Sequence, residues 1–249
     1  YDCAWYGRAT LDLAAALAED PLRWLKLMTT VQELKAPGIS WLGQLFAPLA
    51  GILGDADLPL LASILLTQLA TLLVMRRALE EACPGSPWAA FGGTLALAAA
   101  PLFVGLSHEY YTEPLQTLAP AWTLLAMTSA PRWGERRLAA HLLGAWSLGL
   151  AAKVSAPGYL ILPTAAALLA RRRAGPEDAG RTALAGAAAL AALTAAWYAR
   201  NGGEALLFAR LAFPGGPDLP LAQRALYWAG TLQACLFSAP PRLRGEVHL

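Results

Sequence analysis

Long apolar stretches separated by short polar turns dominate the chain from residue 58 onward. A helix that crosses a bilayer needs about 20 mostly apolar residues. Prolines inside such helices are tolerated, because neighbouring helices satisfy the freed backbone carbonyls. The predicted spans are 58–75, 88–106, 114–128, 138–152, 154–170, 182–199 and the shorter 225–239. The pattern therefore predicts an all-α, polytopic transmembrane helical bundle.

The stretch 1–57 has a different pattern, in which charges are mixed with Trp, Leu and Ala. Residues 11–17 and 22–28 are typical of short amphipathic helices that lie on a bilayer. Residues 39–53 are apolar but short, and Pro48 interrupts them. We expect an interfacial helix there, with a true span as the alternative. The whole of 1–57 is expected to be an extracytoplasmic loop, and 240–249 a cytoplasmic tail.

Arginines cluster in alternate turns between the predicted spans. The clusters are Arg76 and Arg77; Arg132, Arg136 and Arg137; Arg171, Arg172, Arg173 and Arg181; and Arg242 and Arg244. They hold more than half of the 19 lysines and arginines. Because positively charged loops stay in the cytoplasm, this alternation predicts the orientation of the chain in the cytoplasmic membrane.

The opposite, extracytoplasmic face then collects residues that are far apart in the sequence. They are Asp2, Glu33, Lys35, Glu109, Glu113 and Lys153. Lys153 lies between two apolar stretches, where an ionisable group is costly and is a functional candidate by default. The structural alternative is a lysine at a helix end whose ammonium reaches the interface.

Glu113 opens an apolar helix, where the helix dipole stabilises a carboxylate and Pro114 suits the first turn. His108 and Glu109 precede it, but the second histidine of an HExxH zinc motif is absent. We therefore predict no metal ligands and no cofactor, although a divalent metal stays possible. Lys35 lies on a Pro-Gly turn (Lys35-Ala36-Pro37-Gly38), where it is either solvated or binds an anionic head group.

Composition supports a membrane class and excludes others. The chain is 57% hydrophobic and only 14% charged, whereas soluble domains carry about 25% charged residues. A net charge of +2 is too small to indicate nucleic-acid binding. The three cysteines are far apart, so no zinc ribbon or redox pair is expected. Because the chain begins at Tyr1, we expect a fragment whose true N-terminus is missing.

Six short motifs occur in the order found in one family of membrane enzymes. They are Asp2-Cys3-Ala4-Trp5-Tyr6, Lys35-Ala36-Pro37-Gly38, Met75-Arg76-Arg77, Ala100-Pro101-Leu102, Glu113-Pro114-Leu115 and Gly149-Leu150-Ala151-Ala152-Lys153. Together they resemble the GT-C glycosyltransferases of the protein O-mannosyltransferase type, over residues 2 to about 163. Cys3 stands where that family has a second acid, and Ala36 and Gly38 differ from its K-P-P-L-like turn.

The resemblance implies an inverting transferase that uses a polyprenyl-phosphate sugar on the extracytoplasmic face. By analogy Asp2 would be the general base that takes a proton from an acceptor hydroxyl. Lys35 and Lys153 would neutralise the donor phosphate. Glu113, with Glu109 and His108 nearby, would position the donor sugar or the acceptor. The acceptor would be an envelope lipid, a glycan or a protein.

Two hypotheses from other functional classes compete with the glycosyltransferase hypothesis. A transporter or flippase for a lipid-linked or anionic substrate would use the same charges as a substrate pathway, but the sequence lacks inverted symmetry. A non-catalytic membrane scaffold would need no charges gathered on one face. The enzyme hypothesis predicts that Asp2, Lys35, Glu113 and Lys153 converge around one cavity.

Overall fold

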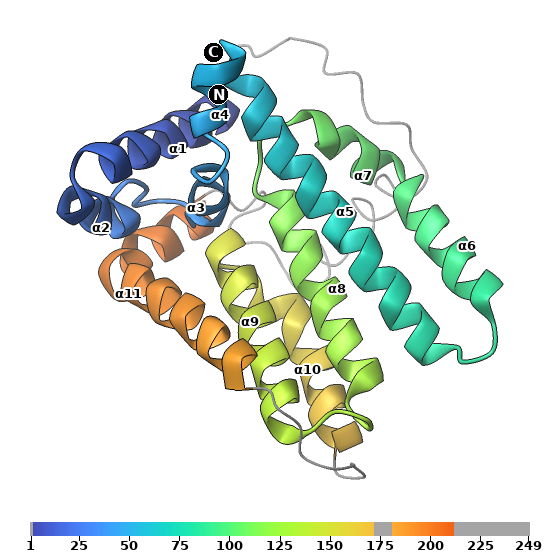
Figure 1. The fold of residues 1–249 in the computed structure, drawn as a ribbon. Helices are drawn as coiled ribbons and strands as arrows, with labels where there is room; N and C mark the ends of the chain where they lie inside the picture. The colour runs from blue at the N-terminus through green and yellow to red at the C-terminus, as the bar shows by residue number, and fades with distance from the viewer. Residues whose placement is uncertain (1, 172–180, 212–249) are drawn as a thin grey trace.

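The computed structural model describes residues 2–171 and 181–211, and this part of the chain contains only helices (Figure 1). The all-α class is therefore confirmed for the described residues. The helices are α1 (Asp2–Glu19), α2 (Pro21–Thr30), α3 (Gly38–Gly43), α4 (Pro48–Leu53), α5 (Asp57–Ala82), α6 (Pro87–Ala98), α7 (Pro101–Gly105), the 3₁₀ turn η1 (Leu106–His108), α8 (Glu113–Ser129), α9 (Glu135–Ala152), α10 (Pro157–Arg171) and α11 (Arg181–Leu211). The predicted span 225–239 and the tail 240–249 lie outside the described residues.

The first two helices are longer than predicted and pack against each other. Asp20 separates them: its carboxylate accepts hydrogen bonds from the backbone N–H groups of Leu22 and Arg23, and Pro21 occupies the first turn of α2. An aspartate cap followed by proline is a strong helix start. The acidic Asp20 therefore ends α1 and begins α2 within one residue.

The single helix expected over 39–53 is wrong, because two short helices, α3 and α4, occupy that stretch. A continuous helix there would need a backbone donor at position 48. Pro48 has no N–H group and its ring crowds the preceding turn. The chain instead turns between Gly43 and Pro48, and α4 ends at Gly54, whose φ of 68° is left-handed.

The main bundle is built by α5, α8, α9, α10 and α11, which pack as neighbours. Figure 1 shows α5 and α8 running in the same direction, with α9 returning beside α8 and α10 and α11 continuing the alternation. Two glycines of α9 lie at close helix contacts: a Cβ at Gly144 would meet the ring of Trp122, and a Cβ at Gly149 would meet Leu160 and Ala119. Small residues let these helices approach closely.

The span predicted over 88–106 is broken. Helices α6 and α7 meet at Ala99 and Ala100 and are bent by 55°. Pro101 cannot continue the hydrogen-bond ladder of α6, and Ala100 adopts an extended conformation. The buried side chain of Gln68 on α5 donates a hydrogen bond of 2.7 Å to the carbonyl of Phe103, which holds α7 against α5.

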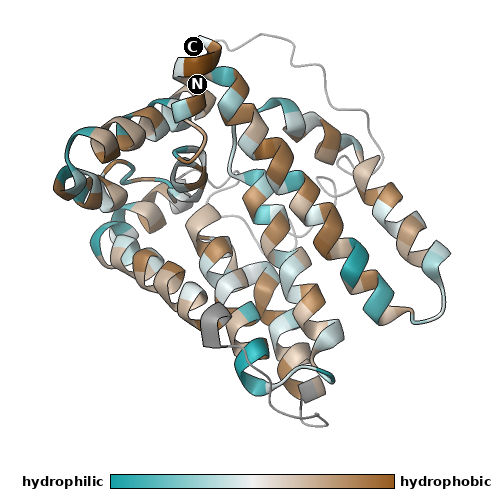
Figure 2. Ribbon diagram, viewed as in Figure 1, coloured by the Kyte–Doolittle hydropathy of each residue, from teal (hydrophilic) through white to brown (hydrophobic). Residues whose placement is uncertain are grey.

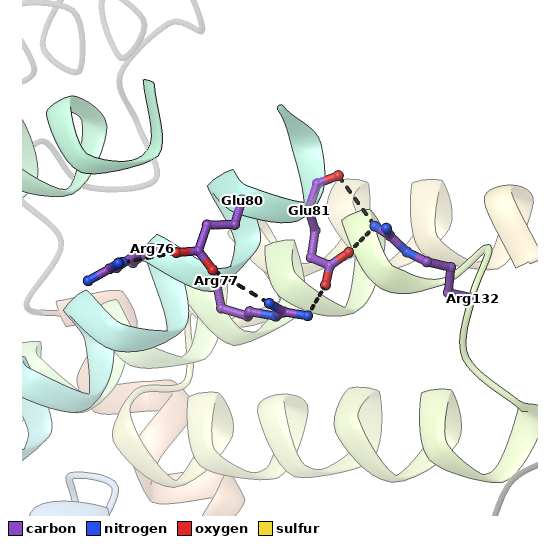
Figure 3. A network of polar contacts seen from close by, with 5 residues as sticks. All are labelled: Arg76, Arg77, Glu80, Glu81 and Arg132. Carbon is purple, nitrogen blue, oxygen red and sulfur yellow. Dashed lines mark hydrogen bonds and ion pairs between the residues drawn. The ribbon is translucent and has the colours of Figure 1, made fainter. Parts of the chain in front are cut away.

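An ion-pair network closes one end of the bundle (Figure 3). Glu81, at the end of α5, pairs with Arg77 at 2.5 Å and with Arg132, which follows α8. Arg76 pairs with Glu80 at 3.0 Å. Residues of two predicted arginine clusters therefore lie at the same end of the bundle: Arg77, which is inside α5 because this helix continues to Ala82 instead of ending at the predicted residue 75, and Arg132, which follows α8. We call this end of the bundle the arginine end.

Only one helix in the described part of the chain, α5, is long and apolar enough to cross a membrane. The bent pair α6–α7 passes the same test if it is counted as one span, and α10 is apolar but shorter. Figure 2 shows apolar residues along the upper part of α5 and along α6. The helix directions match the predicted alternation, while a multi-pass topology stays a prediction.

Candidate functional site

A buried apolar cluster lies at the end of the bundle opposite the arginine end. Its members come from five segments that are distant in the sequence: Tyr6, Ile39, Leu60, Ile64, Tyr110, Leu115 and Ala152. Each predicted site residue is in or next to one of these segments. We call this end of the molecule the site end, because the cluster fixes the backbone from which the site residues project.

Glu113 and Lys153 form an ion pair at the site end. The Lys153 Nζ lies 3.3 Å from Glu113 Oε1. Glu113 is the first residue of α8, and Lys153 leaves α9 in an extended conformation directly after its last helical residue. Their side chains are 36% and 46% exposed, so both groups stay accessible to a ligand. The sequence predicted both residues for one face, and the structure places them in contact.

The turn that carries Lys35 packs against the turn that carries Lys153. A Cβ added at Gly38 would lie 2.6 Å from the carbonyl oxygen of Ala151, closer than real Cβ atoms come to a backbone atom. Only glycine therefore permits this approach of α3 to the end of α9. Two of the motifs noted in the sequence, Lys35–Gly38 and Gly149–Lys153, thus meet in space.

Lys35 is half-buried and lies among aromatic rings. Its Nζ is 5.6 Å from the ring centroid of Trp5, 5.8 Å from that of Tyr6 and 5.5 Å from that of Phe208. An ammonium group within about 6 Å of an aromatic face is stabilised by the ring quadrupole. The rings therefore hold the positive charge of Lys35 beside α1, which is the helix that begins with the predicted base Asp2.

Asp2 is the first residue of α1, but its side chain lies outside the described part of the structure. Among the side chains that are described, no group of three or more His, Cys, Asp or Glu is placed to hold a metal ion.

Tyr110 ties the loop before α8 to both α1 and α3. Its hydroxyl donates a hydrogen bond of 2.9 Å to the carbonyl of Ile39 and lies 2.9 Å from the Thr10 hydroxyl. Burial raises the pKa of the Tyr110 phenol, so this group stays protonated and can donate. A Cβ at Gly43 would overlap the Tyr110 hydroxyl, which explains why glycine ends α3.

An open cavity of about 640 Å³ lies beside this tyrosine, between α1, the start of α5 and the loop after α7. We call it the α1–α5 cavity. Its lining includes Cys3, Gly7, Arg8, Asp57, Leu60 and Glu109. His108 also lines it, so two predicted site residues face this cavity and not the Glu113–Lys153 pair.

Cys3 and Glu109 contact each other in the wall of the cavity. The Cys3 thiol donates a hydrogen bond of 3.0 Å to Glu109 Oε2. Burial raises the pKa of the Cys3 thiol, and the bond to Glu109 raises it further. A protonated cysteine therefore occupies the position where the resembled family has a second acid, and it orients one oxygen of Glu109.

Several residues that build the site were not predicted from the sequence. Gln32 and Ser40 are buried, and the Gln32 amide donates to the Ser40 hydroxyl at 3.0 Å. The indole N–H of Trp197 on α11 donates to the backbone carbonyl of Gln32 at 2.8 Å. Isolated polar residues such as Gln32 and Ser40 give no periodic signal, so the sequence offered no pattern from which their contact could be predicted.

Comparison with protein-family models, with curated proteins and with solved structures finds no match for this chain.

Proposed function

We propose that this chain is a membrane glycosyltransferase. It would move a sugar, with inversion, from a polyprenyl-phosphate donor to a hydroxyl of an envelope lipid, glycan or protein. The reaction would take place on the extracytoplasmic face of the cytoplasmic membrane. The observation that carries the proposal is the meeting of the Lys35 turn and the Lys153–Glu113 pair through the Gly38–Ala151 contact.

The surface of α5 supports a position in the bilayer. Its buried face carries small polar residues at four-residue spacing, Ser63, Thr67 and Thr71, whose hydroxyls donate to carbonyls of their own helix. Its exposed residues include Leu65, Leu66, Leu69 and Leu73. A helix of a water-soluble protein has the opposite pattern, with its apolar stripe facing the core. Such a polar interface and apolar exterior suit lipid.

Helix α6 also exposes apolar side chains. Among its residues only Ala90 is buried, whereas Trp88 is 80% exposed and Phe91 and Leu95 are also exposed. Exposed apolar patches of this kind mark contact with a membrane or a partner. The α5–α6 face, defined by these exposed residues on the two helices, therefore supports lipid contact.

The two lysines suit a lipid-linked phosphate. A phosphate that leaves the anomeric carbon of a sugar gains negative charge, and fixed cations beside it lower the barrier. Lys153 is accessible, and its carboxylate partner Glu113 can instead accept hydrogen bonds from a donor sugar once the phosphate pairs with the lysine. Asp2, at the start of the helix that packs beside Lys35, would take the proton of the acceptor hydroxyl.

A lipid-phosphate binding and transfer assay tests this proposal. Full-length protein in nanodiscs is given a polyprenyl-phosphate sugar with a labelled sugar group and an envelope extract. We expect labelled acceptor with the parent protein, and loss of transfer in Asp2→Asn and Lys153→Ala. Lys26→Ala is the matched control, because Lys26 is an exposed lysine on α2. Transfer that persists in Asp2→Asn would remove that residue from the mechanism.

The bend between α6 and α7 favours the transporter or flippase as a second candidate, because transporters place substrate and ion sites at broken helices. The residues around the bend, 97–102, are Leu, Ala and Pro, with no ionisable side chain. That composition favours the enzyme. The assay separates the two: a flippase moves labelled polyprenyl phosphate between leaflets without transferring its sugar.

A further inference from the structure

The α1–α5 cavity has a chemistry of its own, distinct from that of the two lysines. Its described lining residues include three carboxylates, Asp12, Asp57 and Glu109, against one guanidinium, Arg8, and one imidazole, His108. Arg8 lies 4.0 Å from Asp12, so these two charges largely offset each other. Asp57 and Glu109 then leave the cavity with an excess of negative charge. A phosphate or carboxylate ligand would be repelled there.

The same cavity combines hydrogen-bond acceptors with apolar surface. Ionised carboxylates only accept hydrogen bonds, which suits ligands that carry hydroxyl or ammonium donors. Leu11, Leu60 and Leu61 supply apolar lining. The volume of about 640 Å³ lies within the range of small-molecule sites. A sugar matches this combination, since it has a rim of hydroxyl donors and an apolar C–H face.

The first turns of α1 separate this cavity from the lysines. Cys3 and Gly7 line the cavity, whereas the rings of Trp5 and Tyr6 lie beside Lys35. The loop before α8 divides in the same way: Glu109 faces the cavity and Glu113 pairs with Lys153. Two compartments of opposite charge therefore meet at α1 and at this loop.

We propose that the α1–α5 cavity binds a neutral or amine-bearing sugar and excludes anionic ones. The inference rests on the proposed function, in which this sugar is the acceptor and the lysine side takes the phosphate of the donor. It narrows the acceptor from any envelope hydroxyl to that of an uncharged or cationic carbohydrate.

The native Cys3 thiol allows a binding test that needs no transfer. In full-length protein with Cys83→Ser and Cys235→Ser, Cys3 is the remaining thiol among the three cysteines of the chain. Its labelling by a methanethiosulfonate reagent is followed with methyl glucoside, methyl glucosaminide or methyl glucuronide present. A probe at ~10 times its Kd slows labelling about tenfold if it covers the thiol. We expect protection by the first two probes and none by methyl glucuronide.

Two variants complete the test. A Cβ at Gly7 would lie 3.5 Å from Leu60, an ordinary contact, so Gly7→Leu fits the backbone and fills the cavity. It should abolish protection, whereas Gly92→Leu, at an open position on α6, should retain it. If Gly7→Leu does not fold, Asp57→Asn serves instead and should raise protection by methyl glucuronide relative to methyl glucosaminide.

The proposal would be overturned if methyl glucuronide protected Cys3 as well as methyl glucosaminide does. It would also be overturned if none of the three probes protected Cys3. Protection without detectable sugar transfer would leave the cavity as a sugar site and reject the glycosyltransferase function. Sugar transfer without protection of Cys3 would support the glycosyltransferase function and reject the cavity as a sugar site.

Discussion

The ammonium of Lys153 lies 3.3 Å from the carboxylate of Glu113 and joins the end of α9 to the beginning of α8. This contact spans 40 residues of sequence and holds two ionisable groups at the same end of the bundle. Since both side chains are partly exposed, the pair contributes only about 0–1 kcal/mol to stability. Its accessibility to ligands is therefore the more informative property.

A charge swap separates binding from structure at this pair. Glu113→Lys combined with Lys153→Glu keeps an ion pair but reverses its direction. We expect near-parent thermal stability, within about 1 kcal/mol, and loss of binding to polyprenyl phosphate. Binding is measured by competition with labelled lipid phosphate in nanodiscs. Retention of parent affinity in the swapped protein would show that Lys153 does not contact the phosphate.

Gly38→Ala tests the contact between the two lysine-bearing turns. The added Cβ would meet the Ala151 backbone at 2.6 Å, so α3 must move away from α9. We expect a loss of about 1–3 kcal/mol in stability, typical of overpacking, with weaker donor binding. Gly51→Ala is the control, because nothing lies within 4 Å of a Cβ there. Thermal unfolding in detergent measures the stability of both variants. Equal stability of Gly38→Ala and Gly51→Ala would contradict the close contact between Gly38 and Ala151.

Tyr110→Phe tests the link between the loop, α1 and α3. The substitution leaves the Ile39 carbonyl without its 2.9 Å donor and removes one of the two partners of the Thr10 hydroxyl, which still donates to the Tyr6 carbonyl. We expect a loss of about 1–3 kcal/mol, as for other buried hydrogen bonds left unmade. Thr10→Val alone and with Tyr110→Phe completes a double-mutant cycle. Additive losses in this cycle would mean that the two hydroxyls are not coupled.

The Tyr110 phenol also predicts a pH dependence. Its pKa is raised by burial, so the folded protein holds this proton more tightly than the unfolded chain does. The stabilising contribution is complete below the ordinary tyrosine pKa of about 10 and is lost as the pH rises toward the folded-state pKa. The melting temperature should therefore fall more steeply above about pH 10 in the parent than in Tyr110→Phe. If the melting temperatures of the parent and of Tyr110→Phe fell in parallel above about pH 10, the pH dependence would not come from the Tyr110 phenol.

Much of the helical framework was predictable from apolar stretches and arginine clusters. The span predicted over 138–152 ends, like α9, directly before Lys153, and Glu113 begins α8 as its place before a proline suggested. These features are predictable because helix ends depend on local residues. The arginine end also agrees with the prediction that the arginine clusters lie on one side, since Arg77 and Arg132 share the partner Glu81.

The interruptions and the buried polar contacts were harder to predict. Pro101 and Pro48 break helices, yet Pro120 lies inside α8 without ending it. Whether a proline bends or ends a helix depends on neighbours that supply hydrogen bonds, as Gln68 does for α7. The contact of Tyr110 with Ile39 is likewise a tertiary feature with no local pattern. In contrast, the four-residue spacing of Ser63, Thr67 and Thr71 is a local pattern that the sequence analysis did not use, although it would have indicated a polar helix face.

Sided labelling of two cysteines tests most directly whether the site end and the arginine end face opposite sides of a membrane. Cys83 is exposed next to the arginine end, and Ser155, exposed two residues after Lys153, is replaced by cysteine. Each is made the only thiol of the full-length protein in intact cells and in inverted vesicles. An impermeant maleimide should label Ser155→Cys from outside the cell and Cys83 only in inverted vesicles. Labelling of both positions from the same side would contradict the membrane arrangement and, with it, the proposed site.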